Sequence, residues 1–336
     1  MKAGLVGYPA SGKTTLFNAL TALHRAGHAQ VHLGAIKVPD PRVEAVAELL
    51  LVRRVAHAEI RVADLPGARV AELPAEAEKT LGDSDVICVV LRGFPGLDGT
   101  APDPLRDLRS YDGELALHDL DVVDRRLDRL RKTHGARTGA EYHELERIRI
   151  HLDRGRPLRT LVMSDAERHA LAPLALLSLK PLLAVVNVGE ADLANPLPAE
   201  LEAELAARGA EGLALSVVLE SEIAEMAPED QPPFLAAVGL SEPARDRFIR
   251  AAHHLLDLVT FFTVGGDEVR AWTLHRGDKA PRAAGQIAPE LERGFSRIDV
   301  THYAELMASR GKARSHLEGK EYTVRDGDLL HVRSDH

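Results

Sequence analysis

Short apolar runs alternate with helix-like segments over the first three quarters of the chain. Runs typical of strands occur at residues 3–6, 58–63, 86–91, 181–187 and 213–217. Helix-like segments separate them at 15–20, 43–52, 72–81 and 164–179, and another begins at 221. Apolar strands that alternate with helices predict a parallel α/β sheet buried on both faces. Ligands of such a sheet bind at the carboxyl ends of its strands.

Residues 93–170 depart from this alternation. A stretch rich in Pro and Gly at 93–104 leads into a strongly helical segment at 114–132, and a second helical segment follows at 142–154. The apolar positions of both segments recur every three or four residues: Leu120, Val123, Leu127, Leu130, then Leu145, Ile148, Leu152. This spacing is typical of a two-helix coil. We predict an inserted antiparallel helical hairpin, with a break at His134-Gly135 and charged outer faces that are solvated or meet RNA.

The pattern changes again at about Leu258. Strand-like runs at 261–264, 269–274, 322–324 and 329–333 surround turns such as Asp326-Gly-Asp328. They predict a small α+β domain of roughly 75 residues, a size that suits an independent module. The expected organisation is a first domain of residues 1–92 and 171–257, an inserted helical domain of residues 93–170, and a C-terminal domain of residues 258–336.

Composition narrows the possible functions. The net charge of −9 argues against a general nucleic-acid binder and against sequence-specific DNA recognition, so any RNA contact requires a local basic patch. Cys88 is the single cysteine and is expected to be a small core residue. No apolar run approaches the roughly 18 residues that span a membrane, and the chain begins with a strand. We expect a cytoplasmic protein without a membrane partner.

The candidate chemistry begins at Gly7-Tyr-Pro-Ala-Ser-Gly-Lys-Thr14, which fits the phosphate-loop pattern G-x-x-x-x-G-K-[ST] between a strand and a helix. Glycines let backbone N–H groups converge on phosphate oxygens, and the following helix adds its positive dipole. Lys13 would reach the β- and γ-phosphates, and Thr14 would ligate Mg²⁺. The nucleotide would be bound by Gly7, Ala10, Ser11, Gly12, Lys13, Thr14 and Thr15. A strand–turn–helix without a ligand is the alternative.

A second match, Asp64-Leu-Pro-Gly67, follows the strand at 58–63. In phosphate-loop proteins the Asp of D-x-x-G holds Mg²⁺ through water, and the Gly N–H meets the γ-phosphate. The pattern is also a common turn, but its position one strand and one helix after the loop favours the functional role. The predicted catalytic residues are therefore Lys13, Asp64 and Gly67, with Thr14 and Asp64 as metal ligands.

The base is expected to meet Asn187-Val-Gly-Glu190 at the end of another strand. The guanine code of this fold is Asn-Lys-x-Asp. Here Val188 replaces the Lys, and Glu190 is one methylene longer than the Asp that would accept two hydrogen bonds from guanine. We therefore predict ATP, with GTP less suited, although an ordinary strand-end turn is the alternative. Ser216 and Val217 end the next strand and are expected at the same site.

Three histidines spaced by four, His24, His28 and His32, could share a helical face and bind a metal. Gly27 interrupts that helix, and no cysteine or carboxylate joins the set. A mobile loop is the favoured interpretation.

Several blocks together resemble the YchF/Obg-like ATPases over nearly the whole chain. These blocks are Thr15-Leu-Phe-Asn-Ala-Leu-Thr21, Val38-Pro-Asp-Pro-Arg42, Glu114-Leu-Ala-Leu-His-Asp-Leu-Asp121, Asn187-Val-Gly-Glu190, and the stretches 262–273 and 322–328. The resemblance implies an ATP- and Mg²⁺-binding protein that associates with the ribosome or its RNA and regulates translation or stress. It also implies a ubiquitin-like β-grasp (TGS) domain at the C-terminus.

The chain also departs from that family. Ala10 replaces an Asn that helps to hold potassium, and no Ser or Thr occurs between Thr21 and Thr80 to supply the hydroxyl of the first switch. Residues 68–74 replace a Gly-rich second switch. We therefore expect a slow ATPase used as a ribosome-bound switch. A nucleotide-binding scaffold with little hydrolysis and a GTP-binding regulator remain alternatives; a small-molecule kinase is weaker because no acceptor site is evident.

Overall fold

The computed structural model describes residues 1–25, 30–96, 98–132, 139–193, 195–227 and 229–334. Its packing divides the chain into two compact units. The larger unit joins Lys2–Gly34 to Arg61–Leu255, and the smaller joins Ala35–Ile60 to Leu256–His336, with Met1. Residues 35–60, which the sequence analysis assigns to the first domain, thus pack with the C-terminal residues.

The larger unit is built on the expected parallel sheet. The strands lie in the order β2-β4-β1-β5-β6-β7. They are β2 (His32–Lys37), β4 (Glu59–Asp64), β1 (Lys2–Val6), β5 (Val86–Gly93), β6 (Leu182–Val188) and β7 (Ala210–Leu215). All pairings from β4 to β7 are parallel, because each apolar run returns to the same edge through a helical crossover. The predicted α/β fold is confirmed.

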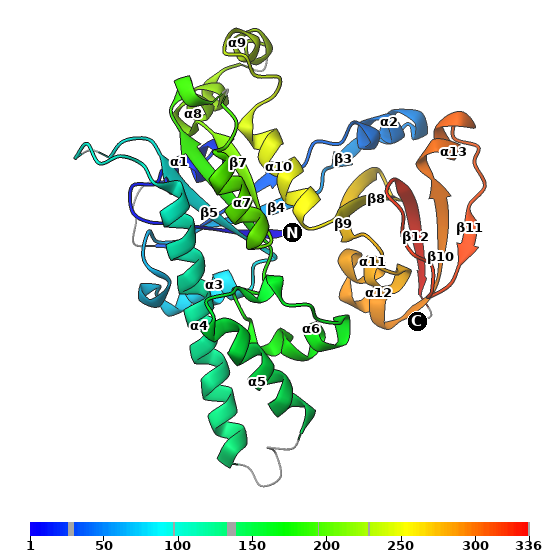
Figure 1. Ribbon diagram of the computed structural model, residues 1–336. Coiled ribbons are helices and arrows are strands. Elements are labelled where there is room, and N and C mark those ends of the chain that lie inside the picture. Colours follow the sequence, from blue (N-terminus) through cyan, green and yellow to red (C-terminus); the bar gives the residue numbers. More distant parts are fainter. Residues whose placement is uncertain (26–29, 97, 133–138, 194, 228, 335–336) are drawn as a thin grey trace. The chain divides into compact units, whose positions relative to one another are not determined.

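Helices cover both faces of this sheet (Figure 1). They include α1 (Lys13–Thr21), α3 (Ala75–Gly82), α7 (Ala199–Ala207), α8 (Val217–Glu225) and α10 (Ala244–Leu255). Helix α9 (Gln231–Ala237) packs through Leu235 against α8. Two starts differ from the sequence prediction: α8 begins at Val217, not near Ser221, and a 3-10 turn, η1 (Val70–Glu72), precedes α3. Cys88 is fully buried in β5, as expected of a core residue.

The predicted helical hairpin is present as α4 (Pro104–Lys132) and α5 (Ala140–Asp153). Its seam is formed by the expected residues, because Val123 and Leu127 of α4 are buried in one cluster with Leu145, Ile148 and Leu152 of α5. The predicted break at His134-Gly135 lies outside the described residues. The sequence places the start of α4 too late, since Asp103 accepts a hydrogen bond from the Arg106 N–H at 3.0 Å and begins the helix at Pro104.

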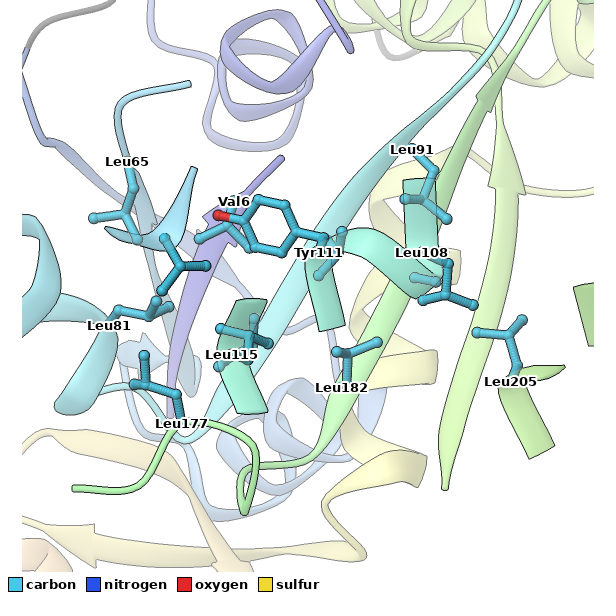
Figure 2. Packing of buried hydrophobic residues seen from close by; sticks show 14 of the residues in the cluster. Val6, Leu65, Leu81, Leu91, Leu108, Tyr111, Leu115, Leu177, Leu182 and Leu205 are labelled. Atoms are coloured by element: carbon cyan, nitrogen blue, oxygen red, sulfur yellow. The ribbon is translucent and has the colours of Figure 1, made fainter. Parts of the chain in front are cut away.

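The early turns of α4 belong to the core of the sheet. Figure 2 shows Leu108, Tyr111 and Leu115 of α4 among the apolar side chains of the strands and of α3 and α7. All three are fully buried. The hairpin is therefore the continuation of a helix whose first turns are packed in the core of the sheet.

One helix prediction is wrong. The segment 164–179 forms only α6 (Asp165–Leu171) and a 3-10 turn, η4 (Ala172–Leu174); a further 3-10 turn, η3 (Leu158–Thr160), precedes it. The capping box of Ser164 and Glu167 begins α6 as predicted. Pro173 lacks the N–H that would continue the helix, and Ala175 then adopts a left-handed conformation with φ of 49°.

The smaller unit contains a mixed sheet with the strand order β11-β10-β12-β8-β9-β3. The strands are β8 (Leu258–Gly265), β9 (Glu268–His275), β10 (Phe295–His302), β11 (His316–Glu318) and β12 (Asp328–Ser334), and the helices are α11 (Ala280–Ile287), α12 (Pro289–Arg293) and α13 (Tyr303–Ala308). A hairpin, a helix packed on the sheet and a parallel central pair of β8 and β12 give the β-grasp arrangement. Strand β10 escaped the sequence analysis, and residues 322–324 contribute only an isolated bridge from Thr323 to Lys279.

An edge strand explains why residues 35–60 pack with this sheet. Strand β3 (Arg54–Ala56) pairs in parallel with β9, and Arg54 forms an ion pair with Glu268 at 3.0 Å. The preceding helix α2 (Pro41–Leu50) has Asp40 as its N-cap, and the Asp40 side chain accepts a hydrogen bond from the Arg42 N–H. The Arg42 guanidinium reaches Asp326 at 2.6 Å. The Val-Pro-Asp-Pro-Arg motif therefore has a structural role: it caps α2 and links that helix to the turn at Asp326 within the smaller unit.

Candidate functional site

The loop after β1 has the conformation that its two glycines permit. Gly7 has φ of 147° and Gly12 has φ of 91°, where L side chains are strained. A Cβ at Gly7 would lie 2.5 Å from the carbonyl oxygen of Val90, and one at Gly12 would lie 2.3 Å from Nδ2 of Asn187. Gly12 is the N-cap of α1 and offers no side-chain acceptor, so the first N–H groups of α1 are available to a ligand.

A buried ion pair joins this loop to the end of the neighbouring strand. Lys13 Nζ lies 2.6 Å from Oδ1 of Asp64, and the side chains are only 6% and 3% exposed. The two meet because β1 and β4 are parallel neighbours, with Leu5 opposite Asp64. His32 Nδ1 lies 3.4 Å from the other Asp64 oxygen. The buried Lys13 side chain is thus already held at the loop by Asp64, where a phosphate would bind.

Asn187 connects the loop to the far side of the sheet edge. Its Nδ2 donates to the carbonyl of Ser11 at 3.0 Å, and its Oδ1 accepts from the Val217 N–H at 3.1 Å. The amide is therefore used in both directions by the protein itself. This observation supports the loop-orienting role of Asn187 and leaves recognition of a base edge to its neighbours.

A cavity of about 750 Å³ lies over these elements. The predicted residues that line it are Ala10, Ser11, Gly12, Lys13, Thr14, Thr15, Gly67, Asn187, Val188, Glu190, Ser216 and Val217. Gly7 and Asp64 do not line it, although Asp64 reaches it through Lys13. Sequence reasoning missed five lining residues: Tyr8, Pro9, Phe94, Gly189 and Val218. Tyr8 lies inside the loop motif and Phe94 directly follows β5, so their positions in the chain were the available signals.

The donor set of the cavity fits a nucleotide with its metal. Ser11 Oγ is buried and makes no hydrogen bond to the residues that the structure describes, so it can serve a ligand. Backbone N–H groups, an ammonium and hydroxyls suit phosphate, whereas the apolar walls at Phe94, Val188 and Val217 suit a purine face. Burial, with Glu114 nearby, raises the pKa of the Tyr8 phenol above its usual value and keeps that group neutral.

The histidine site receives no support. In the part of the chain that the structure covers, no group of three His, Cys, Asp or Glu side chains could hold a metal ion. His28, the middle residue of the trio, lies outside the described residues, while His32 is directed to Asp64. Within the same coverage, no helix is long and apolar enough to cross a membrane.

Family models match both ends of the chain. Residues 2–123 match the model described as 50S ribosome-binding GTPase. Residues 258–335 match the YchF-GTPase C-terminal model, which is described as a protein of unknown function.

Whole-chain relatives agree with these matches. A Bacillus subtilis protein called ribosome-binding ATPase YchF is 34% identical, with 99% of each chain covered. A protein of the same name from Haemophilus influenzae is 35% identical over 99% of this chain and 98% of its own. The solved structure of the Schizosaccharomyces pombe YchF GTPase superposes with a TM-score of 0.80 at 26% identity, covering 99% of this chain and 97% of that one.

Proposed function

The chain belongs to the YchF family, and from that premise we propose that it binds ATP with Mg²⁺, hydrolyses it slowly and associates with the ribosome. One observation carries the proposal: a single cavity collects the phosphate loop, the Lys13–Asp64 pair and the Asn187-Val-Gly-Glu190 segment at one sheet edge. The relatives' names supply the ribosome as partner. Such a partner would place the protein in the cytoplasm.

The phosphates would be held by the loop N–H groups, the start of α1 and Lys13. Thr14 and Asp64 would hold Mg²⁺, which neutralises phosphate charge when it is bound. Lys13 would exchange Asp64 for phosphate oxygens, and the freed carboxylate would then be available for the metal side of the site. Ser11 Oγ offers one further hydrogen bond.

Adenine is the better fit at the base end. Asn187 is occupied by Ser11 and Val217, so the residues left to read the base edge are Val188, Glu190 and Ser216. Val188 cannot place an ammonium over the ring, and Glu190 is too long for the two-hydrogen-bond contact to guanine. Adenine lacks an N1–H and loses less at a site without that acceptor.

Hydrolysis should be slow because positioning groups are few. No Ser or Thr occurs between Thr21 and Thr80, and Ala10 cannot ligate a potassium ion. The same observation favours a second candidate function, a nucleotide-binding scaffold that hardly hydrolyses. The GTPase names of both family models and of one solved relative keep a GTP-binding regulator as a third candidate.

Single-turnover hydrolysis of radiolabelled ATP and GTP, with and without ribosomes, tests the proposal. A slow ATPase switch gives measurable ATP cleavage that changes with ribosomes. A scaffold binds ATP without cleaving it under either condition, and a GTP regulator cleaves GTP in preference. Co-sedimentation of the tagged protein with ribosomes checks the partner; absence of the protein from the ribosomal fraction would contradict the partner assignment.

The C-terminal sheet is the candidate for that contact, but its charges are partly compensated. Arg270, Lys279, Arg282 and Arg293 each lie within 4.0 Å of a Glu side chain. Arg297 on β10 is exposed, and no acidic partner of it is recorded among the described residues. Deleting residues 259–336 would not isolate the ribosome contact, because it would also remove the β9 partner of β3 and the Asp326 partner of Arg42. Charge reversal at Arg297 is the cleaner probe.

A further inference from the structure

The side chain of Glu114 on α4 contacts both the phosphate loop and the segment that follows Gly67. Oε1 of Glu114 lies 2.9 Å from the Tyr8 hydroxyl and 3.2 Å from Nε of Arg69, and Oε2 accepts a hydrogen bond from the Val70 N–H at 2.8 Å. Ser110, one turn earlier on α4, lies 2.7 Å from the same Tyr8 hydroxyl. The Glu114 side chain is 11% exposed, so water competes weakly for these contacts.

The partners of Glu114 come from functionally distinct segments. Tyr8 belongs to the phosphate loop and lines the cavity. Arg69 and Val70 follow one residue after Asp64-Leu-Pro-Gly67, and Val70 begins the turn η1. This segment occupies the position of the Gly-rich second switch of the YchF/Obg-like family. Gly67 lies close to Pro9 of the loop, since a Cβ there would be 3.5 Å from Pro9 Cα. Glu114 therefore contacts one cavity-lining residue, Tyr8, and the two residues that follow the segment ending at Gly67.

Other buried carboxylates of the same helix have different partners. Asp112 pairs with Arg159 and Arg208, and Asp119 accepts from the N–H groups of Leu177 and Ser178. None of these partners lines the cavity. Their contacts hold α4 to the body of the larger unit, which is a structural role. Glu114 differs because one of its partners, Tyr8, is part of the candidate site.

We propose that Glu114 is a positioning residue of the nucleotide site, which fixes Tyr8 and the segment after Gly67 and couples both to the helical hairpin. This inference rests on the proposed ATP binding. The coupling follows because α4 is one continuous helix from its buried turns to the hairpin, and Tyr111 packs edge-to-face on Tyr8 at 5.4 Å. A nucleotide that moves the loop or Gly67 must then alter the contacts of Glu114. By linkage, if bound nucleotide changes the affinity of the hairpin for a partner, that partner changes the affinity for nucleotide by the same factor.

The test uses the full-length protein, four single variants and one double variant. Glu114→Gln keeps the shape but sets an amide donor against the Val70 N–H or loses the Arg69 pair, and Glu114→Ala removes every contact. Tyr8→Phe removes only the hydroxyl. Asp124→Asn is the matched control, because Asp124 lies on the same helix and pairs with Arg149 across the hairpin, away from the cavity.

Two measurements are made on each variant. Competition against a fluorescent ATP analogue in Mg²⁺ gives the affinity for ATP, and hydrogen–deuterium exchange with and without Mg²⁺–ATP reports on residues 68–74 and 104–118. We expect ATP affinity to fall about fivefold or more in Glu114→Gln and the nucleotide-dependent protection of both segments to be lost. Asp124→Asn should match the wild type. Tyr8→Phe combined with Glu114→Gln should lose less affinity than the sum of the two single losses, because the two side chains share one contact.

Unchanged affinity and unchanged protection in folded Glu114→Gln and Glu114→Ala would overturn the inference. If both Glu114 variants fail to fold, Tyr8→Phe decides alone: wild-type affinity and wild-type exchange in it would overturn the inference equally. Failure of the wild-type protein to bind Mg²⁺–ATP is a different result, since it removes the proposed function on which the inference stands.

Discussion

Two buried aspartates, one in each unit, have similar surroundings and different meanings. Asp64 ends β4, and Asp328 begins β12; both are almost fully buried, and both lie beside a histidine. Asp328 accepts hydrogen bonds from Nδ1 of His302 at 2.7 Å, from the Tyr322 hydroxyl at 2.7 Å and from the backbone N–H of Arg325 at 2.9 Å. Tyr322 and Arg325 lie in the turn that leads into β12, and His302 ends the neighbouring strand β10, so all three donors belong to the smaller sheet and its turn.

Asp64 has instead a lysine as its closest partner, and that lysine lines a cavity. The difference teaches that burial and a neighbouring histidine do not identify a site. A carboxylate whose donors all belong to the surrounding fold has a structural role, whereas one whose partner also lines a ligand-sized cavity can exchange that partner for a ligand.

The largest effect is expected from Lys13→Ala. The variant loses a charge-assisted contact to phosphate of about 1.5–3 kcal/mol, so affinity for Mg²⁺–ATP should fall roughly ten- to hundredfold or become unmeasurable. It also leaves Asp64 buried without its cation, so calorimetric titration should be paired with thermal melting and with Lys13→Ala/Asp64→Asn, which relieves that unpaired charge. Wild-type affinity in a folded Lys13→Ala protein would show that the loop does not bind phosphate.

Exchanging each aspartate for asparagine should separate the two roles. Asp328→Asn replaces an acceptor with an amide donor inside a closed set of donors and should cost about 1–3 kcal/mol of unfolding free energy, with ATP affinity unchanged. Asp64→Asn should instead reduce the gain in ATP affinity that Mg²⁺ provides over EDTA. Denaturant unfolding and calorimetry on both variants give the answer. The comparison breaks if Asp328→Asn weakens ATP binding as much as Asp64→Asn does.

The preference for one base tests whether the cavity beside Asp64 binds a nucleotide as assigned. ATP should outcompete GTP about tenfold or more in a titration with fluorescent nucleotide. A tenfold difference in affinity corresponds to about 1.4 kcal/mol, and one buried polar group left unpaired costs about 1–3 kcal/mol. Glu190→Asp alone should not restore GTP, because Val188 remains. Equal or tighter binding of GTP would mean that Asn187-Val-Gly-Glu190 does not select adenine.

The smallest effect is expected from the monovalent cation. Ala10 carries a methyl group that cannot ligate potassium, so ATP hydrolysis should proceed at the same rate in potassium and sodium within about twofold. Parallel single-turnover reactions in the two salts, at equal ionic strength, measure this. Several-fold stimulation by potassium would require another ligand near the loop and would reopen the assignment of the site.

Local patterns were sufficient for much of the fold. The apolar runs predicted the parallel sheet, and the heptad-like spacing predicted the seam of α4 and α5, because each depends on periodicity along a single segment. They failed where a neighbour decided the outcome. Pro173 ended a helix that its flanking residues favoured, and β10 is a strand because β11 and β12 pair with it on both sides.

The sequence by itself determined the phosphate loop, the strand-end residues and the family, since these depend on residue type and spacing within short motifs. Only the tertiary structure decided which of those residues meet. It paired Lys13 with Asp64, used both ends of the Asn187 amide between Ser11 and Val217, and brought Glu114 behind Tyr8. Such contacts join segments far apart in the chain, and their distances are set by sheet order and helix packing, which no local pattern encodes.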